Sequence, residues 1–122
     1  MEEAIQYACL KVGYSELKPF QKTVLKDLGK GMDSFVCVPT GAGKSVLFEC
    51  APFMSHFLLT DGKPDTRNVD RIALVISPLV SLMRTQCSEL VDRGISAAYL
   101  SDISADTQKE AGCATLDKVC WL

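Results

Sequence analysis

A glycine-containing segment sets the fold class predicted for this chain: Phe35-Val36-Cys37-Val38-Pro39-Thr40-Gly41-Ala42-Gly43-Lys44-Ser45. Its first part is an apolar run with the composition of a β-strand. A loop with two glycines follows, and Lys44-Ser45 opens another apolar segment. A strand, a glycine loop and a helix in this order are typical of a phosphate-binding loop. The segment therefore predicts a site for the phosphates of a ligand.

The residue types of this loop suit an anion. Glycines at 41 and 43 allow consecutive backbone N–H groups to turn toward the anion without Cβ clashes. We expect Lys44 to reach the outer phosphates as a mobile point charge, and the Ser45 hydroxyl to bind Mg²⁺. The helix that begins here adds the positive end of its dipole. The predicted phosphate contacts are Thr40, Gly41, Ala42, Gly43, Lys44 and Ser45.

The match to the general phosphate-binding pattern is incomplete at one position. The pattern G-x-x-x-x-G-K-[ST] requires glycine where this chain has Val38. The alternative is a glycine-rich turn that precedes Lys-Ser by chance. An apolar strand before the loop and an apolar helix after it favour the phosphate-binding loop.

Composition indicates an ordinary globular domain, or part of one, because 48% of the 122 residues are hydrophobic and 7% are aromatic. The net charge of −2 shows no overall basic field for nucleic acid, although a local basic strip would be enough to bind it. The six cysteines form no Cys-x-x-Cys pair, and His56 is the only histidine, so we expect buried thiols and no zinc site. The start lacks the basic residues of a signal peptide, and no apolar run reaches membrane-spanning length, which predicts an intracellular protein.

The rest of the sequence alternates between helical and strand patterns. Helices are predicted at 2–11, 19–28, 45–58 and 81–93, and strands at 35–38, 71–77 and 97–100. The stripes expected to face the core are Ala4, Ile5, Ala8, Cys9 and Val12; Phe20, Val24, Leu25 and Leu28; and Leu82, Met83, Cys87, Leu90 and Val91. The third helix is apolar on nearly every face, which predicts enclosure, with His56 near its exposed edge. The uninterrupted apolar run at 71–77 is typical of the centre of a parallel sheet.

This order of elements, with short turns, predicts parallel strands joined by right-handed crossovers. The fold class is therefore α/β, a doubly wound parallel sheet of the P-loop NTPase type. Three regions are expected: N-terminal helices at 1–33, a partial lobe core at 34–102, and a poorly defined tail at 103–122. Residues 60–70 are predicted to form a surface loop, and residues 104–110 to start a helix.

Three blocks of the sequence resemble the RecQ-like branch of superfamily 2 DNA helicases, which belongs to the DEAD/DEAH-box group. The adenine-recognition motif of that branch is similar to Gly13-Tyr14-x-x-Leu17-Lys18-Pro19-x-Gln21. Its motif I resembles Pro39-Thr40-Gly41-Ala42-Gly43-Lys44-Ser45. Its motif Ia resembles Ile76-Ser77-Pro78-Leu79-Val80-Ser81-Leu82-Met83-Arg84-x-Gln86. Order and spacing agree over residues 10–102, and the third block is the most specific to the family.

The resemblance implies an ATP·Mg²⁺ site. Gln21 would hydrogen-bond the adenine edge, because a side-chain amide offers a donor and an acceptor together. Tyr14 would stack on the base. Lys18 stands where the family usually has a stacking arginine, so the charge is kept and the planar face is lost. Lys44 and Ser45 would hold the phosphates and Mg²⁺, with Lys44 as the catalytic residue.

The resemblance also implies contact with the DNA backbone. The residues expected there are Ser77, Pro78, Ser81 and Arg84, which would position a strand without reading its sequence. Structural alternatives exist for both sites. Tyr14 and Gln21 can pack and cap the second helix, while Ser77 and Ser81 can end a strand and cap a helix.

The function implied is that of an ATP-dependent 3′–5′ DNA helicase acting on single-stranded or forked DNA in the nucleus. ATP hydrolysis in this class needs an Asp-Glu pair and a second lobe, and the sequence has no Asp-Glu pair. We therefore expect a truncated front part of the first motor lobe that binds ATP and DNA without unwinding. Two other classes stay open: another P-loop nucleotide-binding protein such as a kinase, and a catalytically inactive interaction module.

Overall fold

The computed structural model describes residues 1–64, 71–99 and 119–121. The chain divides into two compact units, Met1–Arg71 and Ile72–Leu122. The first unit holds the predicted phosphate loop, and the second holds the block that resembles motif Ia. The three regions expected from the sequence stay a prediction.

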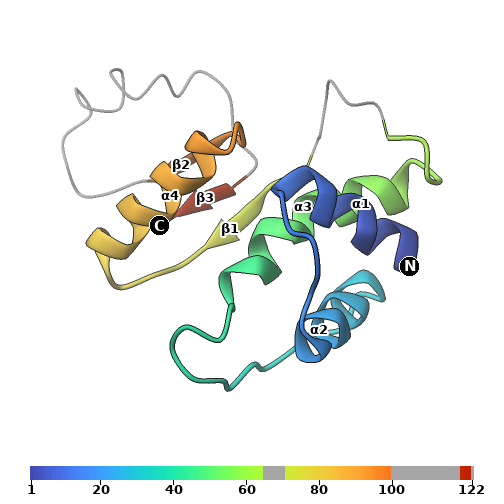
Figure 1. Ribbon diagram of the computed structural model, residues 1–122, viewed down its shortest axis with the longest axis horizontal. Coiled ribbons are helices and arrows are strands. Elements are labelled where there is room, and N and C mark those ends of the chain that lie inside the picture. The colour runs from blue at the N-terminus through green and yellow to red at the C-terminus, as the bar shows by residue number, and fades with distance from the viewer. Residues whose placement is uncertain (65–70, 100–118, 122) are drawn as a thin grey trace. The chain divides into compact units, whose positions relative to one another are not determined.

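The described residues of the first unit form three helices: α1 (Glu2–Val12), α2 (Pro19–Gly29) and α3 (Ser45–Leu59). Both α1 and α2 pack against α3, and α1 also contacts α2 (Figure 1). The whole predicted stripe of α1 is buried, which confirms the helical pattern read from the sequence. Gly13 ends α1 with a φ of +91°, a left-handed conformation that favours glycine.

The inward face of α2 differs from the prediction. Leu25 is buried as expected, whereas Leu28 is exposed and Phe20 and Val24 are half-buried. The second buried residue of α2 is polar, because Gln21 occupies the inward position with a 3% exposed side chain. A buried amide is stable only with hydrogen-bond partners, and Gln21 has two, described below.

The prediction that His56 lies near an exposed edge of α3 is wrong. His56 is only 6% exposed. It lies on one stripe with Glu49, Pro52 and Phe53, which are spaced three and four residues apart along the helix. Since α1 and α2 both pack on α3, this stripe is enclosed together with its polar members.

Tyr7 of α1 carries a buried hydroxyl that has no hydrogen-bond partner within the described residues. Its ring lies 5.2 Å from the ring of Phe57, and burial raises the pKa of the phenol. We expect Tyr7→Phe to raise the free energy of unfolding by about 1 kcal/mol, because it removes an unsatisfied polar group and keeps the ring contact. Urea denaturation measures the change, and a lower free energy of unfolding in the variant would show that the hydroxyl is satisfied.

The strand predicted before the phosphate loop is wrong. Residues 32–39 form no helix or strand in the described structure, and Phe35 is 96% exposed. A β-strand needs a neighbouring strand to pair its backbone N–H and C=O groups. The apolar composition of this segment favours a β-strand, but no strand among the described residues lies beside it to pair with it.

The described residues of the second unit form a small parallel sheet and one helix. Its elements are β1 (Ala73–Val75), α4 (Val80–Asp92), β2 (Ala97–Tyr99) and β3 (Val119–Trp121). The strand order is β1-β3-β2, and both pairings with β3 are parallel (Figure 1). Parallel strands β1 and β2, joined through α4, agree with the predicted α/β class, although both are shorter than expected. The strand β3 was not predicted, because it lies in the segment expected to be a poorly defined tail. The larger doubly wound sheet stays a prediction, and the helix expected at 104–110 lies outside the described residues.

Fewer apolar side chains are buried in the described part of the second unit than the sequence predicts. Met83, Cys87 and Leu90 of α4 are buried as expected, whereas Leu82 and Val91 are exposed. The prediction of a fully buried strand at 71–77 is also wrong, because the side chains at Ile72, Leu74 and Ile76 are exposed. These three residues alternate along the chain, so they share one face of β1 and its extensions.

The structure also tests two further predictions, the burial of the cysteines and the lack of a membrane-spanning segment. Cys9, Cys50 and Cys87 are buried, as expected for small structural thiols, whereas Cys37 is exposed. The exposure of Cys37 follows from the missing strand around it. In the part of the chain that the structure describes, no helix combines the length and the apolar character needed to cross a membrane.

Candidate nucleotide-binding site

The phosphate loop is a tight turn that depends on its glycines. The N–H of Ala42 donates to the carbonyl of Pro39 over 3.1 Å, which closes the turn. Gly41 has a φ of +82°, the value that a type II turn requires at its third residue. Gly43 follows with a φ of +94°, so the loop changes direction twice before α3 begins. The two glycines therefore adopt the left-handed conformation expected of them, and their contact with phosphates stays a prediction.

Lys44 and Ser45 lie at the start of α3. Lys44 is exposed, and its Nζ donates to the carbonyl of Val38 over 3.0 Å. Ser45 is the first residue of α3, so its hydroxyl lies beside the unpaired N–H groups of the helix start. A phosphate can replace the Val38 carbonyl as the acceptor of the Lys44 ammonium, with a stronger, charge-assisted hydrogen bond.

Gln21 joins the second helix to the phosphate loop. Its Oε1 accepts a hydrogen bond from the N–H of Lys18 over 2.7 Å. Its Nε2 donates to the carbonyl of Gly43 over 2.7 Å. Lys18 makes a second link, because its Nζ donates to the carbonyl of Ala42 over 2.8 Å. Two residues predicted to recognise adenine are thus bonded to two residues predicted to hold phosphate.

Tyr14 is tied to the helix that follows the phosphate loop. Its hydroxyl donates to Oε2 of Glu49 over 2.6 Å. Glu49 is 3% exposed and lies in α3, one turn after Ser45. Sequence reasoning missed Glu49. The available signal was a single carboxylate in a helix that is otherwise almost entirely apolar, since such a group must find hydrogen-bond partners when buried.

The residues predicted to contact DNA lie together in the second unit. Ser77 and Pro78 follow β1, and Ser81 and Arg84 lie in the first turns of α4. Pro78, Ser81 and Arg84 are exposed. The Ser77 hydroxyl accepts a hydrogen bond of 3.4 Å from the N–H of Leu79, so it also stabilises the turn into α4. The alternative role of Ser81 as a helix cap is wrong, because α4 begins at Val80 without a side-chain cap.

Comparison with protein families places this arrangement among helicases. The model of the DEAD/DEAH box helicase family matches residues 18–118, which include Lys18, Gln21 and the whole phosphate loop. The chain belongs to the DEAD/DEAH box helicase family.

The most similar curated relatives point to the RecQ type within this helicase family. The chain is 38% identical over 95 residues to "ATP-dependent DNA helicase Q-like 4B" of Arabidopsis thaliana, covering 78% of this chain and 7% of the relative. It is 33% identical over 98 residues to "ATP-dependent DNA helicase RecQ" of Pasteurella multocida, covering 80% and 13%. It is 33% identical over 118 residues to "Bifunctional 3'-5' exonuclease/ATP-dependent helicase WRN" of Mus musculus, covering 94% and 7%. The resemblance to RecQ-like helicases is confirmed, and the chain spans a small part of each relative's length.

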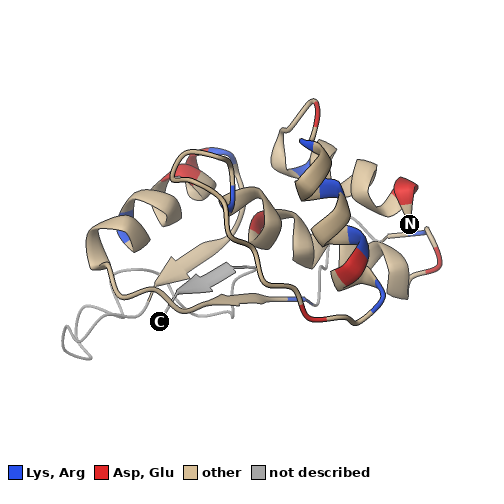
Figure 2. Ribbon diagram, turned by 90° about the horizontal axis from the view of Figure 1, so that it is seen from below, with Lys and Arg blue, Asp and Glu red and all other residues tan. Residues whose placement is uncertain are grey.

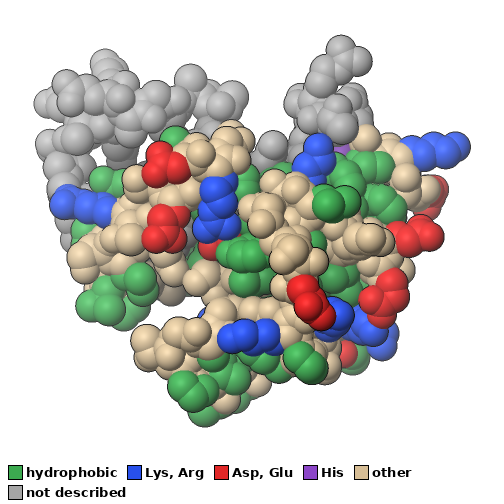
Figure 3. Space-filling view, viewed as in Figure 1, with side chains coloured by type: hydrophobic (Ala, Val, Ile, Leu, Met, Phe, Trp, Pro, Cys, Tyr) green, Lys and Arg blue, Asp and Glu red, His purple; other side chains and the backbone are tan. Residues whose placement is uncertain are grey.

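Charges on this helicase chain are mixed, as the net charge predicts. Basic and acidic residues are both scattered over the described elements (Figure 2), and both are present on the face shown in Figure 3. One ion pair joins Lys26 of α2 to Glu2 of α1, and the Lys26 ammonium lowers the pKa of the Glu2 carboxyl. The Glu2 side chain is 68% exposed and the Lys26 side chain 38%, so water screens this pair and it contributes little to stability.

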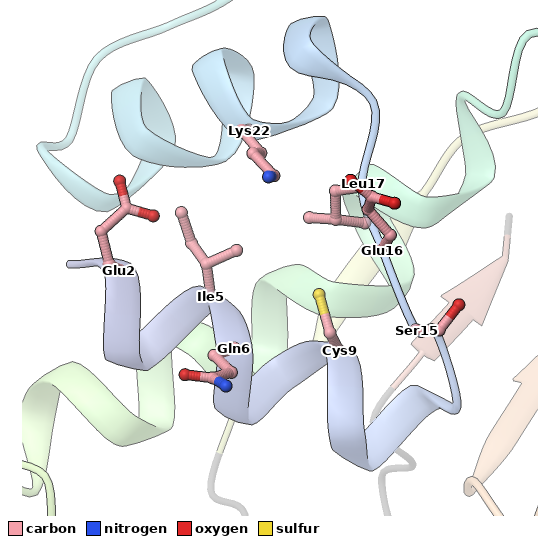
Figure 4. Close-up of a pocket in the computed structure, with 8 residues that line it drawn as sticks. All are labelled: Glu2, Ile5, Gln6, Cys9, Ser15, Glu16, Leu17 and Lys22. Atoms are coloured by element: carbon pink, nitrogen blue, oxygen red, sulfur yellow. The ribbon is translucent and has the colours of Figure 1, made fainter.

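A pocket of about 230 Å³ lies in the first unit, and three of the residues that line it, at 15–17, belong to the adenine-recognition block. Figure 4 shows Lys22 pointing from α2 toward α1, while Ile5 and Cys9 point from α1 toward α2. The eight residues that line it are Glu2, Ile5, Gln6, Cys9, Ser15, Glu16, Leu17 and Lys22. None of them is a predicted nucleotide contact, so the pocket is distinct from the phosphate loop.

Proposed function

We propose that this chain is the adenine- and phosphate-binding part of a motor lobe in a RecQ-type, ATP-dependent 3′–5′ DNA helicase. One observation supports this most strongly. The side chains of Lys18 and Gln21 bond directly to the carbonyls of Ala42 and Gly43, so a base-recognition block and a phosphate loop form one structural unit. A phosphate loop alone is shared by many nucleotide-binding proteins, whereas this joint arrangement suits a ligand with a base at one end and phosphates at the other.

The residues of the first unit fit ATP and Mg²⁺. Backbone N–H groups of residues 40–45 would hold the phosphates, and two positive-φ glycines allow that approach. Lys44 would neutralise the outer phosphates, and Ser45 would bind the Mg²⁺ that accompanies them. Tyr14 would stack on the base and Gln21 would bond its edge, beside Lys18. Bound Mg²⁺ supplies charge neutralisation on the phosphate oxygens.

The second unit would contact the DNA. We propose that Ser77, Pro78, Ser81 and Arg84 bind the backbone of single-stranded or forked DNA. A hydroxyl, a main-chain amide and one cation position a strand without reading its sequence. Unwinding, the larger doubly wound sheet, the fragment character of this chain and a nuclear location are proposals that follow from the helicase family. Hydrolysis would need an Asp-Glu pair, and this sequence contains none.

The experiment is a titration of the chain with a fluorescently labelled, single-stranded oligodeoxynucleotide, with and without ATP·Mg²⁺. We expect saturable binding that weakens as salt increases, and tighter ATP binding when DNA is present. Arg84→Gln should reduce the steepness of the plot of log affinity against log salt by about 1, the value expected for the loss of one phosphate contact. Lys63→Gln, which changes an exposed lysine outside the proposed sites, is the matched control.

Two results would contradict the proposal. If ATP affinity is the same with and without DNA, nucleotide binding and DNA binding are not coupled in this chain, and the proposed helicase role of these sites is contradicted. If Arg84→Gln and Lys63→Gln give the same salt slope as the parent chain, the start of α4 does not contact the DNA backbone.

A further inference from the structure

Tyr14 is held at two separate points. Gly13 ends α1 in a left-handed conformation, and the N–H of Tyr14 then donates to the carbonyl of Cys9 over 2.9 Å. At the other end of the residue, the Tyr14 hydroxyl donates to Oε2 of Glu49 over 2.6 Å, across 35 positions of sequence. The first bond fixes the backbone and the second fixes the tip of the side chain. The direction of the ring is therefore set from both ends.

This double attachment leaves the ring able to stack. A phenol hydroxyl lies in the plane of its ring, so a hydrogen bond made there uses neither face. Tyr14 is half-buried, so part of the ring remains at the surface of the first unit. A flat base can therefore lie against a ring whose orientation is fixed before the base arrives, and less entropy is lost on binding.

Glu49 is itself rigidly placed. It is 3% exposed and lies on the buried side of α3 with Val46, Cys50 and Phe53. A carboxylate in such a position costs free energy unless hydrogen bonds compensate for lost water, and the Tyr14 hydroxyl supplies one of them. Ser45 and Glu49 are one helical turn apart, so they share one side of α3. The same helix therefore carries a predicted Mg²⁺ ligand and the anchor of Tyr14.

We propose that Glu49 is a positioning residue for nucleotide recognition, which holds the Tyr14 hydroxyl and so orients the ring that stacks on the base. This role rests on the proposed ATP site. It makes Glu49 a determinant of affinity for the base and leaves affinity for the phosphates to the loop. Because α3 also carries Ser45, the same helix would fix the position of the stacking ring relative to the phosphates.

The test separates base binding from phosphate binding. Calorimetric titrations with ATP·Mg²⁺ and with inorganic tripolyphosphate·Mg²⁺ are compared for Tyr14→Phe, Glu49→Met and Glu49→Gln. Tyr14→Phe removes the donor, Glu49→Met removes the acceptor at similar length, and Glu49→Gln keeps an acceptor oxygen. We expect the first two to weaken ATP binding about fivefold, with tripolyphosphate binding unchanged and with no added loss in the double variant. Glu49→Gln should restore most of the ATP affinity.

Each outcome decides between the role of Glu49 and the site itself. If Glu49→Met weakens both ligands equally, Glu49 only maintains the phosphate loop, and the proposal is overturned. If the ratio of ATP to tripolyphosphate affinity matches that of the parent chain, Glu49 does not position Tyr14. If the parent chain binds neither ligand, the proposed function fails, and this role fails with it. If Glu49→Met does not fold, Tyr14→Phe decides, since it must lose ATP affinity selectively.

Discussion

Lys44→Ala is expected to lower the affinity for ATP·Mg²⁺ about 100-fold, which corresponds to about 2.8 kcal/mol. Charge-assisted hydrogen bonds to phosphate oxygens are the strong ones in such a site, and the Lys44 ammonium would make them at the start of α3. The side chain is exposed, and its Nζ bonds to the carbonyl of Val38, so little of the folded structure depends on it. We expect the free energy of unfolding to change by less than about 0.5 kcal/mol.

A titration with a fluorescent ATP analogue measures this loss, with urea denaturation of both proteins alongside. Lys30→Ala is the matched control, because Lys30 is another exposed lysine of the first unit and lies outside the predicted site. Equal affinities of the parent chain and Lys44→Ala, with both folded, would rule out a nucleotide site at this loop. Family membership would then be the only part of the interpretation to survive.

Gly43→Ala should lower the free energy of unfolding by about 2–5 kcal/mol and abolish ATP binding. Two costs add. A φ of +94° strains an alanine by about 1–2 kcal/mol. The new Cβ would also lie 2.6 Å from Nε2 of Gln21. The Gln21 side chain is buried and bonded at both ends of its amide, so moving it away breaks the hydrogen bond to the Gly43 carbonyl, at about 1–3 kcal/mol.

Gly41→Ala is the control that separates these two costs. Gly41 has a similar φ of +82°, but a Cβ at that position would meet nothing within 4 Å. We expect it to show the backbone strain alone. In a Gln21→Ala background, Gly43→Ala should cost no more than Gly41→Ala, because the clashing amide is gone. Equal destabilisation by the two glycine substitutions in the parent chain would show that Gln21 moves freely.

The sequence predicted the positions of helices and strands more reliably than which of their side chains are buried. The stripe of α1 was confirmed in full because a helix of this kind buries its apolar face against a neighbour within the same unit. The strands were less predictable. An apolar run such as 71–77 identifies a strand, but only three of its residues pair, and Leu74 and Ile76 stay exposed. Periodicity shows which side chains are apolar and gives no information on what covers them.

The candidate site shows the same division. The left-handed conformation of the loop glycines could be predicted because the motif itself calls for a tight turn there. The role of Lys44 stays a prediction. The hydrogen bond between Tyr14 and Glu49 could not be predicted, because it joins residues 35 positions apart and depends on how α1 and α3 pack. The expected strand at 35–38 failed for a related reason, since a strand is defined by a partner that may lie far along the chain, and none lies beside it in the described residues.

The Gln21 amide would couple the binding of the base to the binding of the phosphates. Its oxygen is fixed by the N–H of Lys18 and its nitrogen by the carbonyl of Gly43, so it reports the orientation of a peptide group inside the phosphate loop. A phosphate ligand that turned this peptide group would also move the Gln21 amide, which is proposed to bond the base. Coupling free energies are reciprocal, so the base would strengthen phosphate binding by the same factor as the phosphates strengthen base binding. Through Gln21, the complete nucleotide would bind more tightly than the separate affinities of its base and its phosphates imply.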